Sequence, residues 1–199
     1  RLSLVGSEMC IRDSINTDNG VTFNGVSSVT TADVVASNGI VHIVDSVIGL
    51  PTVVTFAVAD PNFEILVQAL TRDDLTMDFV GLLNSSTSPP TPLTVFAPVN
   101  NAFVNLLDEL GLNGLNDIDE PTLSAVLTYH VVTGANQLSI NLSDGMEFTT
   151  AGGGALLFNF GDNGEGILTD NNGRTSNIVA VDVQANNGII HAIDKVVLP

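Results

Sequence analysis

The chain has 199 residues and carries 22 acidic against 5 basic side chains, for a net charge of −17. This charge argues against nucleic acid and anionic membranes as partners, because both are bound through basic patches on a protein. A single cysteine excludes a disulfide framework, and 44% apolar residues without any Trp favour a β-rich fold with an aliphatic core.

The first fourteen residues, RLSLVGSEMCIRDS, differ in composition from the rest of the chain. They hold the only cysteine and show no hydrophobic period. The segment resembles a translated sequencing-adaptor remnant of the kind found at the ends of contigs. We therefore interpret residues 1–14 as a non-native sequencing remnant and leave them out of the fold prediction.

Short strands are expected next. Ile15–Val29 contains Asp18-Asn19-Gly20 and Asn24-Gly25, two strong turn signals that predict hairpins. Ile40–Ile48 is apolar and β-branched, and we predict a buried strand that ends at Gly49-Leu50-Pro51. Polar residues interrupt this region, so no stretch of about 18 residues is continuously apolar and no transmembrane segment is predicted in this chain.

The most informative feature of the sequence is a repeat. Residues 33–47 read DVVASNGIVHIVDSV, and residues 182–196 read DVQANNGIIHAIDKV, 149 residues later. That interval is the size of an ordinary domain, so the repeat indicates an array of domains. We interpret residues 15–51 as the C-terminal fragment of a first domain and residues 52–199 as a complete second domain. The fragment would lack partner strands, so we expect it to be mobile or docked on its neighbour.

The second domain begins with helices. Thr52–Val58 is expected to be a short strand or an extended lead-in. Asp60-Pro61 predicts a helix start, with Asp as N-cap and Pro at the first helical position. Apolar residues follow at helical spacing, and a second helical segment is predicted over Asp74–Leu83. Asn84–Pro92, which reads NSSTSPPTP, is a loop by composition.

A strand and a capped helix are expected after this loop. Leu93–Phe96 predicts the strand. Asn100 or Asn101 then caps a helix that runs through Leu110, with apolar side chains on one face. Gly111 ends this helix, because glycine adopts the left-handed conformation of a helix C-terminus without strain.

The last part of the chain changes from helix to strands. Asp119-Glu120-Pro121 starts a helix that ends at about Leu127, and Tyr129–Val132 is predicted to be a strand. Short strands separated by Gly, Asp and Asn turns follow, and the final two are expected at Ile178–Val183 and Gly188–Val197. Helices first and strands later, without regular alternation, predict an α+β fold.

Three segments, in this order, resemble the fasciclin domain family. They are Thr94–Phe103 (TVFAPVNNAF), Leu127–Val132 (LTYHVV) and Asn187–Val196 (NGIIHAIDKV). The resemblance implies a wedge-shaped β-sandwich with several helices packed beside it. It also implies structural roles for motif residues of the first and third segments. These are Asn100, Phe103, Asn187, Gly188, His191 and Asp194.

The resemblance implies an extracellular or cell-surface adhesion module without enzymatic activity. Its expected partners are a cell-surface or matrix protein, or a polysaccharide. No nucleophile elbow, P-loop or dinucleotide fingerprint is present, and no cofactor is expected. The alternative is a secreted module that binds a small molecule or a lipid, which would require an apolar cavity.

Candidate binding residues come from the same resemblance. In animal members, integrin-dependent adhesion is attributed to the Tyr-His region, here Tyr129 and His130, and to an Asp-Ile pair, here Asp182 and Val183. The alternative for Tyr129 and His130 is structural, because on a strand they would point to opposite faces and at least one would be packed. His191 is interpreted as a core histidine that ties strands together through hydrogen bonds.

Two clusters of Asp, Asn and Gly are candidates for weak calcium binding. Asp162–Glu165 and Asp170–Asn172 carry oxygen ligands, but they lack the alternating ligands and distant Glu of a regular calcium loop. The alternative is the turn chemistry of hairpins.

Overall fold

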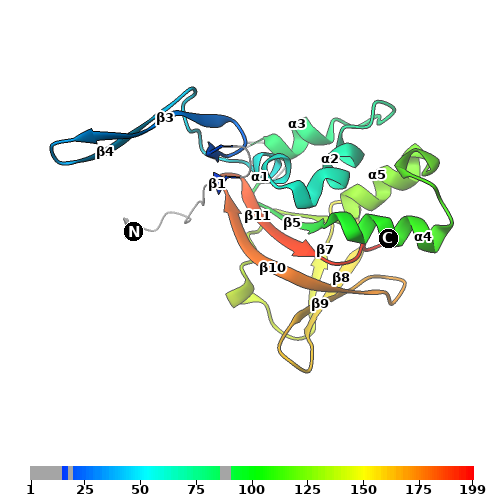
Figure 1. The fold of residues 1–199 in the computed structure, drawn as a ribbon. Coiled ribbons are helices and arrows are strands. Elements are labelled where there is room, and N and C mark those ends of the chain that lie inside the picture. The colour runs from blue at the N-terminus through cyan, green and yellow to red at the C-terminus, as the bar shows by residue number, and fades with distance from the viewer. Residues whose placement is uncertain (1–14, 18–19, 86–90) are drawn as a thin grey trace.

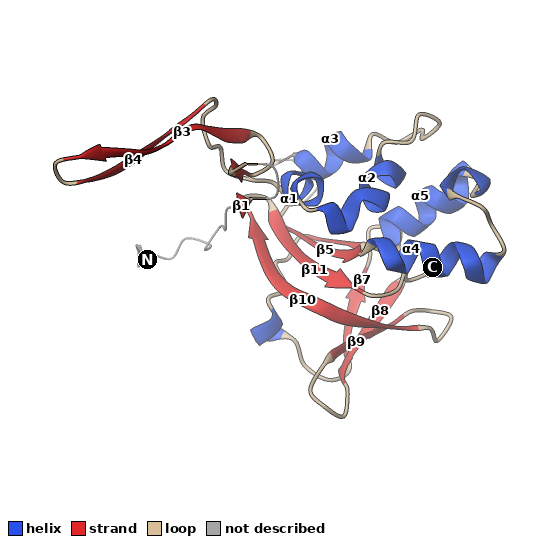
Figure 2. Cartoon of the chain, in the orientation of Figure 1, coloured by secondary structure: helices blue, strands red, loops and turns tan. Residues whose placement is uncertain are grey.

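The computed structural model describes residues 15–17, 20–85 and 91–199, so the predicted remnant at 1–14 lies outside the described residues. A helical group covers a large curved sheet, and a long hairpin projects from the body (Figures 1 and 2). The helices are α1 (Val53–Ala59), α2 (Glu64–Leu70), α3 (Phe79–Asn84), α4 (Asn100–Leu110) and α5 (Glu120–Tyr129), with short 3-10 turns η1 (Pro61–Phe63), η2 (Leu115–Asp117) and η3 (Ser139–Asn141). This arrangement confirms the α+β prediction.

The described strands form two sheets. The smaller has the order β1-β2-β3-β4, and the larger has the order β6-β5-β11-β10-β9-β8-β7. The smaller sheet contains β1 (Ile15–Asn16), β2 (Thr22–Phe23), β3 (Ser27–Ala36) and β4 (Gly39–Val44). The larger sheet contains β5 (Leu93–Pro98), β6 (Val131–Thr133), β7 (Met146–Thr149), β8 (Ala155–Phe160), β9 (Gly166–Thr169), β10 (Thr175–Ala185) and β11 (Gly188–Ile193).

The larger sheet folds over on itself at β10. This strand pairs with β9 near its start and with β11 near its end, and its register shifts between Ile178 and Val183. Such irregularities bend a strand and increase its twist. As a result β5 and β7 face each other across an interior, where the rings of Phe96 and Phe148 lie 5.7 Å apart. The sheet therefore forms the two layers of a sandwich.

The parallel pair of β5 and β11 lies at the centre and is buried along its whole length. One face packs on the helices, through residues such as Val95 and Ile190. The other face packs inside the folded sheet, through Phe96 and Ile193. Burial on both faces explains why these segments are continuously apolar rather than alternating.

Two elements of the helical layer differ from the prediction. Thr52–Val58 was expected to be extended, but Val53–Ala59 is helix α1, because Thr52 and Thr55 form a capping box and one helical face is buried. The helix expected over Asp74–Leu83 is confined to α3, where Asp78 provides the N-cap. Asp74 instead forms an ion pair with Arg72, before the helix starts.

Helix α4 confirms its predicted end but not its predicted cap. Gly111 adopts a left-handed conformation with φ of 67° and ends the helix. The N-cap residue is Val99, which has no capping side-chain hydrogen bond. Asn100 instead accepts a hydrogen bond from the backbone N–H of Ile65 and donates one to the carbonyl of Pro61. It therefore joins α4 to the start of α2.

The hairpin β3–β4 projects from the body (Figure 1). Ile40–Ile48 was predicted to contain a buried strand, and this was wrong, because every residue of β4 except Val44 is exposed. In the described residues β4 pairs only with β3, whereas β11 lies between β5 and β10. The missing neighbour accounts for the exposure of an apolar sequence.

Glycine is required where β11 meets β5. A Cβ atom placed at Gly188 would lie 2.4 Å from the carbonyl oxygen of Leu93, whereas nothing lies within 4 Å of a Cβ at the equivalent Gly39. We expect Gly188→Ala to lower the free energy of unfolding by about 1–3 kcal/mol through overpacking. Gly39→Ala serves as the matched control and should leave it almost unchanged. Urea denaturation measures both, and equal effects would contradict the close approach.

Candidate functional site

The Tyr-His pair lies at the end of α5, not on a strand as predicted. Asp119 caps this helix at its start, and Tyr129 is its last residue. The Tyr129 side chain is fully buried. Its hydroxyl donates a hydrogen bond to the carbonyl of Ala155 and accepts one from the backbone N–H of Asn171. Gly154 allows this packing, because a Cβ atom there would lie 2.3 Å from the Tyr129 ring. Both polar bonds of the phenol are therefore used within the fold.

His130 is also buried, and both ring nitrogens have partners. Nδ1 lies 2.7 Å from the carbonyl oxygen of Val126, and Nε2 lies 3.2 Å from the backbone nitrogen of Val197. Since Nδ1 donates and Nε2 accepts, the bonds require the neutral tautomer. Burial lowers the pKa of His130 to about 4. The ring thus connects the end of α5 to the C-terminal segment.

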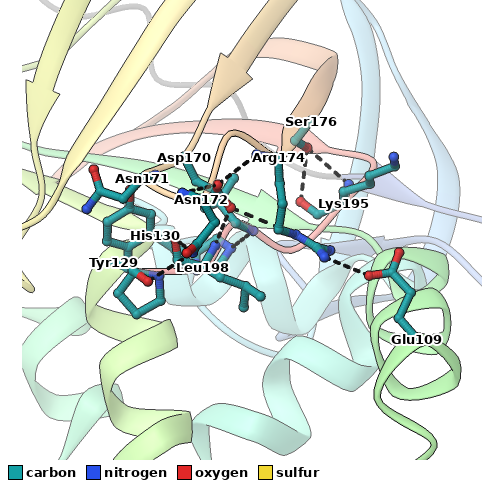
Figure 3. Close-up of polar contacts among 12 residues, drawn as sticks. Glu109, Tyr129, His130, Asp170, Asn171, Asn172, Arg174, Ser176, Lys195 and Leu198 are labelled. Atoms are coloured by element: carbon teal, nitrogen blue, oxygen red, sulfur yellow. Dashed lines mark hydrogen bonds and ion pairs between the residues drawn. The ribbon is translucent and has the colours of Figure 1, made fainter.

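A turn at residues 170–174 holds these parts together (Figure 3). The buried carboxylate of Asp170 accepts hydrogen bonds from the backbone N–H groups of Asn172, Arg174 and Leu198, each at 2.9 Å. The guanidinium of Arg174 extends to Glu109 on α4, at 2.8 Å. The sequence indicated a turn or a weak calcium site here. It could not reveal the bond between Asp170 and Leu198, because these residues are 28 positions apart. Both carboxylate oxygens of Asp170 accept hydrogen bonds from the backbone.

His191 and Asp182 lie on the last hairpin. Nε2 of His191 donates to the carbonyl of Gln137 at 2.7 Å, and the ring stacks on Phe96. Burial lowers the pKa of His191. Asp182 has φ of 61°, and its carboxylate accepts from the backbone N–H of Ser139 at 2.8 Å and from the hydroxyl of that serine. Both side chains therefore connect the segment around Gln137 and Ser139 to the sheet through hydrogen bonds.

The other motif residues also make contacts within the fold. Asn187 accepts from the N–H of Val53 at 3.0 Å and donates to the carbonyl of Leu83 at 2.6 Å, joining β11 to α1 and α3. Asp194 accepts from the N–H of Asn177 at 2.7 Å. Phe103 is buried in the helical core.

An apolar groove lies between the start of the helical layer and the bent part of β10. Its volume is about 400 Å³, and its lining includes Phe56, Phe63, Val183, Ile190 and Ala192. Val179 also lines it and is 56% exposed. The sequence did not reveal this groove, because it depends on the register shifts of β10. Of the four predicted binding residues, only Val183 lines it.

Two features are absent from the residues that the structure describes. These residues contain no group of three or more His, Cys, Asp or Glu residues that could hold a metal ion. Among them no single helix is long and apolar enough to cross a membrane. The pair formed by α1 and Pro61–Leu70 would qualify by length and composition only, and it is bent by 100°.

Comparison with known proteins identifies the family. The sequence matches the family model of the Fasciclin domain over residues 3–51 and 61–199, and the chain belongs to this family. The uncharacterized protein sll1735 of Synechocystis is 35% identical over 153 residues, covering 75% of this chain and 98% of that protein. Human periostin is 28% identical over 187 residues, covering 88% of this chain and 20% of periostin.

A solved structure has the same fold. It is a FAS1 domain pair from the insect cell adhesion molecule Fasciclin I, with a TM-score of 0.59 and 22% sequence identity. The match covers 94% of this chain and 67% of the insect one. The expected family and fold are therefore confirmed.

The buried histidines should make stability depend on pH. An unfolded chain binds protons on these rings below a pH of about 6.5, whereas folded His130 resists protonation until about pH 4. Their contribution is therefore fully present above pH 6.5 and is lost as the pH falls, by up to about 1.4 kcal/mol per pH unit for each histidine. Urea denaturation at pH 7 and pH 5 measures the loss.

Two variants separate this effect from general acid sensitivity. His130→Gln should be less stable than the parent at pH 7 but should lose less stability between pH 7 and pH 5. The control is His42→Gln, which changes a histidine that is exposed on β4 and should retain the parent's pH dependence. A parent protein that is equally stable at pH 7 and pH 5 would contradict the role of the buried rings.

Proposed function

We propose that this protein is an extracellular or cell-surface adhesion module that binds another protein through its surface and catalyses no reaction. The family membership supports the class, and a solved relative of the same fold comes from a cell adhesion molecule. The observation that supports the proposal is that the polar motif side chains form hydrogen bonds within the fold. In an active site, polar groups would instead converge on a pocket.

The apolar groove is the proposed contact surface. It combines the buried rings of Phe56 and Phe63 with Val179 of β10, which is 56% exposed. Apolar patches with a polar surround are typical of protein interaction sites. Asp60 and Asn62 also line the groove and would supply hydrogen bonds. A matrix or cell-surface protein fits this groove better than a polysaccharide, because sugar rings are usually held by exposed aromatic side chains, whereas Phe56 and Phe63 are buried and the exposed Val179 is aliphatic.

Tyr129, His130 and Asp182 would act on such binding indirectly. Their polar atoms bond within the fold, so their replacement would change the structure on which the surface depends. Val183 differs, because it lines the groove itself. We therefore retain Val183 as a contact residue and assign the other three to the support of the fold.

The groove also supports the alternative function. Its volume of about 400 Å³ falls within the range of small-molecule sites, roughly 300–1,000 Å³, and its lining is mostly apolar. A module that binds a lipid or an apolar small molecule would use the same residues. Titration with a fluorescent fatty acid distinguishes the two functions: saturable uptake at one site per chain supports the alternative, and its absence supports adhesion.

Adhesion is tested with the whole chain immobilised on a surface. Cells, matrix proteins and polysaccharides are offered with calcium and again with chelator. Saturable binding to a protein or cell surface that persists in chelator is expected from an aliphatic contact. Retention of polysaccharide alone, or binding only with calcium, would contradict the proposed contact.

A pair of valine substitutions locates the contact surface. We expect Val179→Asp to weaken this binding at least 10-fold, because it places a charge beside the apolar lining. Val104→Asp on α4 is the matched control, since Val104 is 45% exposed and does not line the groove. Both variants should keep the parent's melting temperature. Equal binding by the two variants would place the contact elsewhere.

A further inference from the structure

The hairpin β3–β4 reproduces the hairpin β10–β11 in detail. Both hairpins have the same register, with Ala36 opposite Gly39 in one and Ala185 opposite Gly188 in the other, and both have register shifts at equivalent places. The backbone angle φ is positive at Asp33 and at Asp182, with values of 57° and 61°. The first hairpin therefore has the conformation that the second has inside a domain.

The closing hydrogen bonds of the two hairpins also correspond. Asp45 accepts from the N–H of Ser28 at 2.7 Å, as Asp194 does from that of Asn177 at 2.7 Å. The hydroxyl of Ser27 donates to the carbonyl of Ser46, as that of Ser176 donates to that of Lys195. These bonds lie within each hairpin, so they explain its shape without any partner.

A second group of shared residues serves contacts outside the hairpin in its second copy. In the second hairpin Asn187, Gly188, His191 and Asp182 make contacts with other parts of the domain. Their equivalents are Asn38, Gly39, His42 and Asp33, and all four are exposed. The first hairpin therefore carries the residues for a set of contacts that the described structure fills only in the second hairpin.

The apolar strand residues lead to the same conclusion. Ile40, Val41 and Ile43 of β4 are 61%, 51% and 49% exposed, whereas their equivalents Ile189, Ile190 and Ala192 are 1%, 3% and 6% exposed. An exposed strand edge with apolar side chains on both faces is a template for pairing with another strand. The covered state is already known from β11, which pairs in parallel with β5.

We propose that the hairpin β3–β4 is a docking surface for a second fasciclin-domain core, one that resembles residues 52–174 and precedes the hairpin in the same protein. A parallel strand equivalent to β5 would pair with the open edge of β4. Asn38 would hold the start of a helix, as Asn187 holds Val53. Asp33 would accept from a backbone N–H and a hydroxyl, as Asp182 does from Ser139.

His42 of the first hairpin has a ring N–H that could donate to this partner. Nδ1 of His42 accepts from the backbone N–H of Asp33 at 3.2 Å, which places the ring proton on Nε2. In His191 it is Nε2 that donates, to the carbonyl of Gln137. Ile43 is larger than its equivalent Ala192, but Ala192 lines the apolar groove, where space for the larger side chain exists.

The test is a fusion that supplies such a core. Residues 52–174 are joined directly to residue 26, followed by the chain through residue 199, because Val26 is the equivalent of Thr175 at the start of β10. Amide hydrogen exchange is measured at residues 40–44 in the fusion and in the parent chain. We expect exchange there to slow by about 100-fold or more in the fusion, as for amides of a buried central strand.

Gly39→Ala is the diagnostic variant, because it has no steric effect in the parent chain. In the fusion the new methyl group should meet a carbonyl, as a Cβ at Gly188 would meet Leu93. The domain formed by the added core and the hairpin β3–β4 should then have a melting temperature about 3–10 °C lower. The melting temperature of the parent chain with the same substitution should not change.

Two results would overturn the proposal. In one, β4 exchanges as fast in the fusion as in the parent and the added core shows no cooperative melting. In the other, the parent chain dimerises through β4 in a concentration-dependent way, which would make a second copy the partner. Neither measurement involves an adhesion ligand, so the outcome is independent of the proposed function.

Discussion

The parallel pairing of β5 with β11 is the interaction on which the rest of this structure depends. Six consecutive residue pairs, from Leu93 with Gly188 to Pro98 with Ile193, hold the two strands together. Backbone hydrogen bonds continue at both ends, from Leu93 to Asn187 and from Val99 to Ile193. Because the pair is buried on both faces, the helices pack against one face and the rest of the folded sheet packs against the other. The approach is so close that Gly188 cannot carry a side chain without a shift of Leu93.

Buried polar side chains connect this centre to the surrounding elements. Asn187 reaches α1 and α3, His191 reaches the segment at Gln137, and His130 joins α5 to the C-terminal segment. All four of these bonds end on backbone atoms, which need partners when buried. The sequence indicated structural roles for Asn187 and His191. In the structure both side chains form hydrogen bonds within the fold.

Local chemistry explains what the sequence could predict. Asp119 and Gly111 mark helix ends through bonds and conformations that involve only neighbouring residues. Helix α1 could not be predicted in the same way, because its valines and phenylalanine favour strands and only the capping box and burial against the core decide for helix. Tyr129 was misplaced for a similar reason, since contacts with Ala155 and Asn171 keep it at the end of a helix.

Long-range features were accessible only through the family resemblance or through the structure. The order of β6, β5 and β11 joins segments far apart in the chain, and no local pattern specifies it. The groove depends on register shifts within β10, which periodicity does not reveal. The repeat marked two similar segments, 33–47 and 182–196, yet one contributes an exposed strand and the other a buried one. Burial is thus a property of the neighbours of a strand as much as of its own residues.

The most direct test of this account compares the two hairpins by amide hydrogen exchange in the unmodified chain. If the β5 pairing supplies the stability, amides of residues 188–193 should exchange only through global unfolding. Amides of residues 39–44 that do not bond to β3 should then exchange orders of magnitude faster. Equal protection of both strands would contradict the account, because it would mean that each hairpin is stable by itself and owes little to β5.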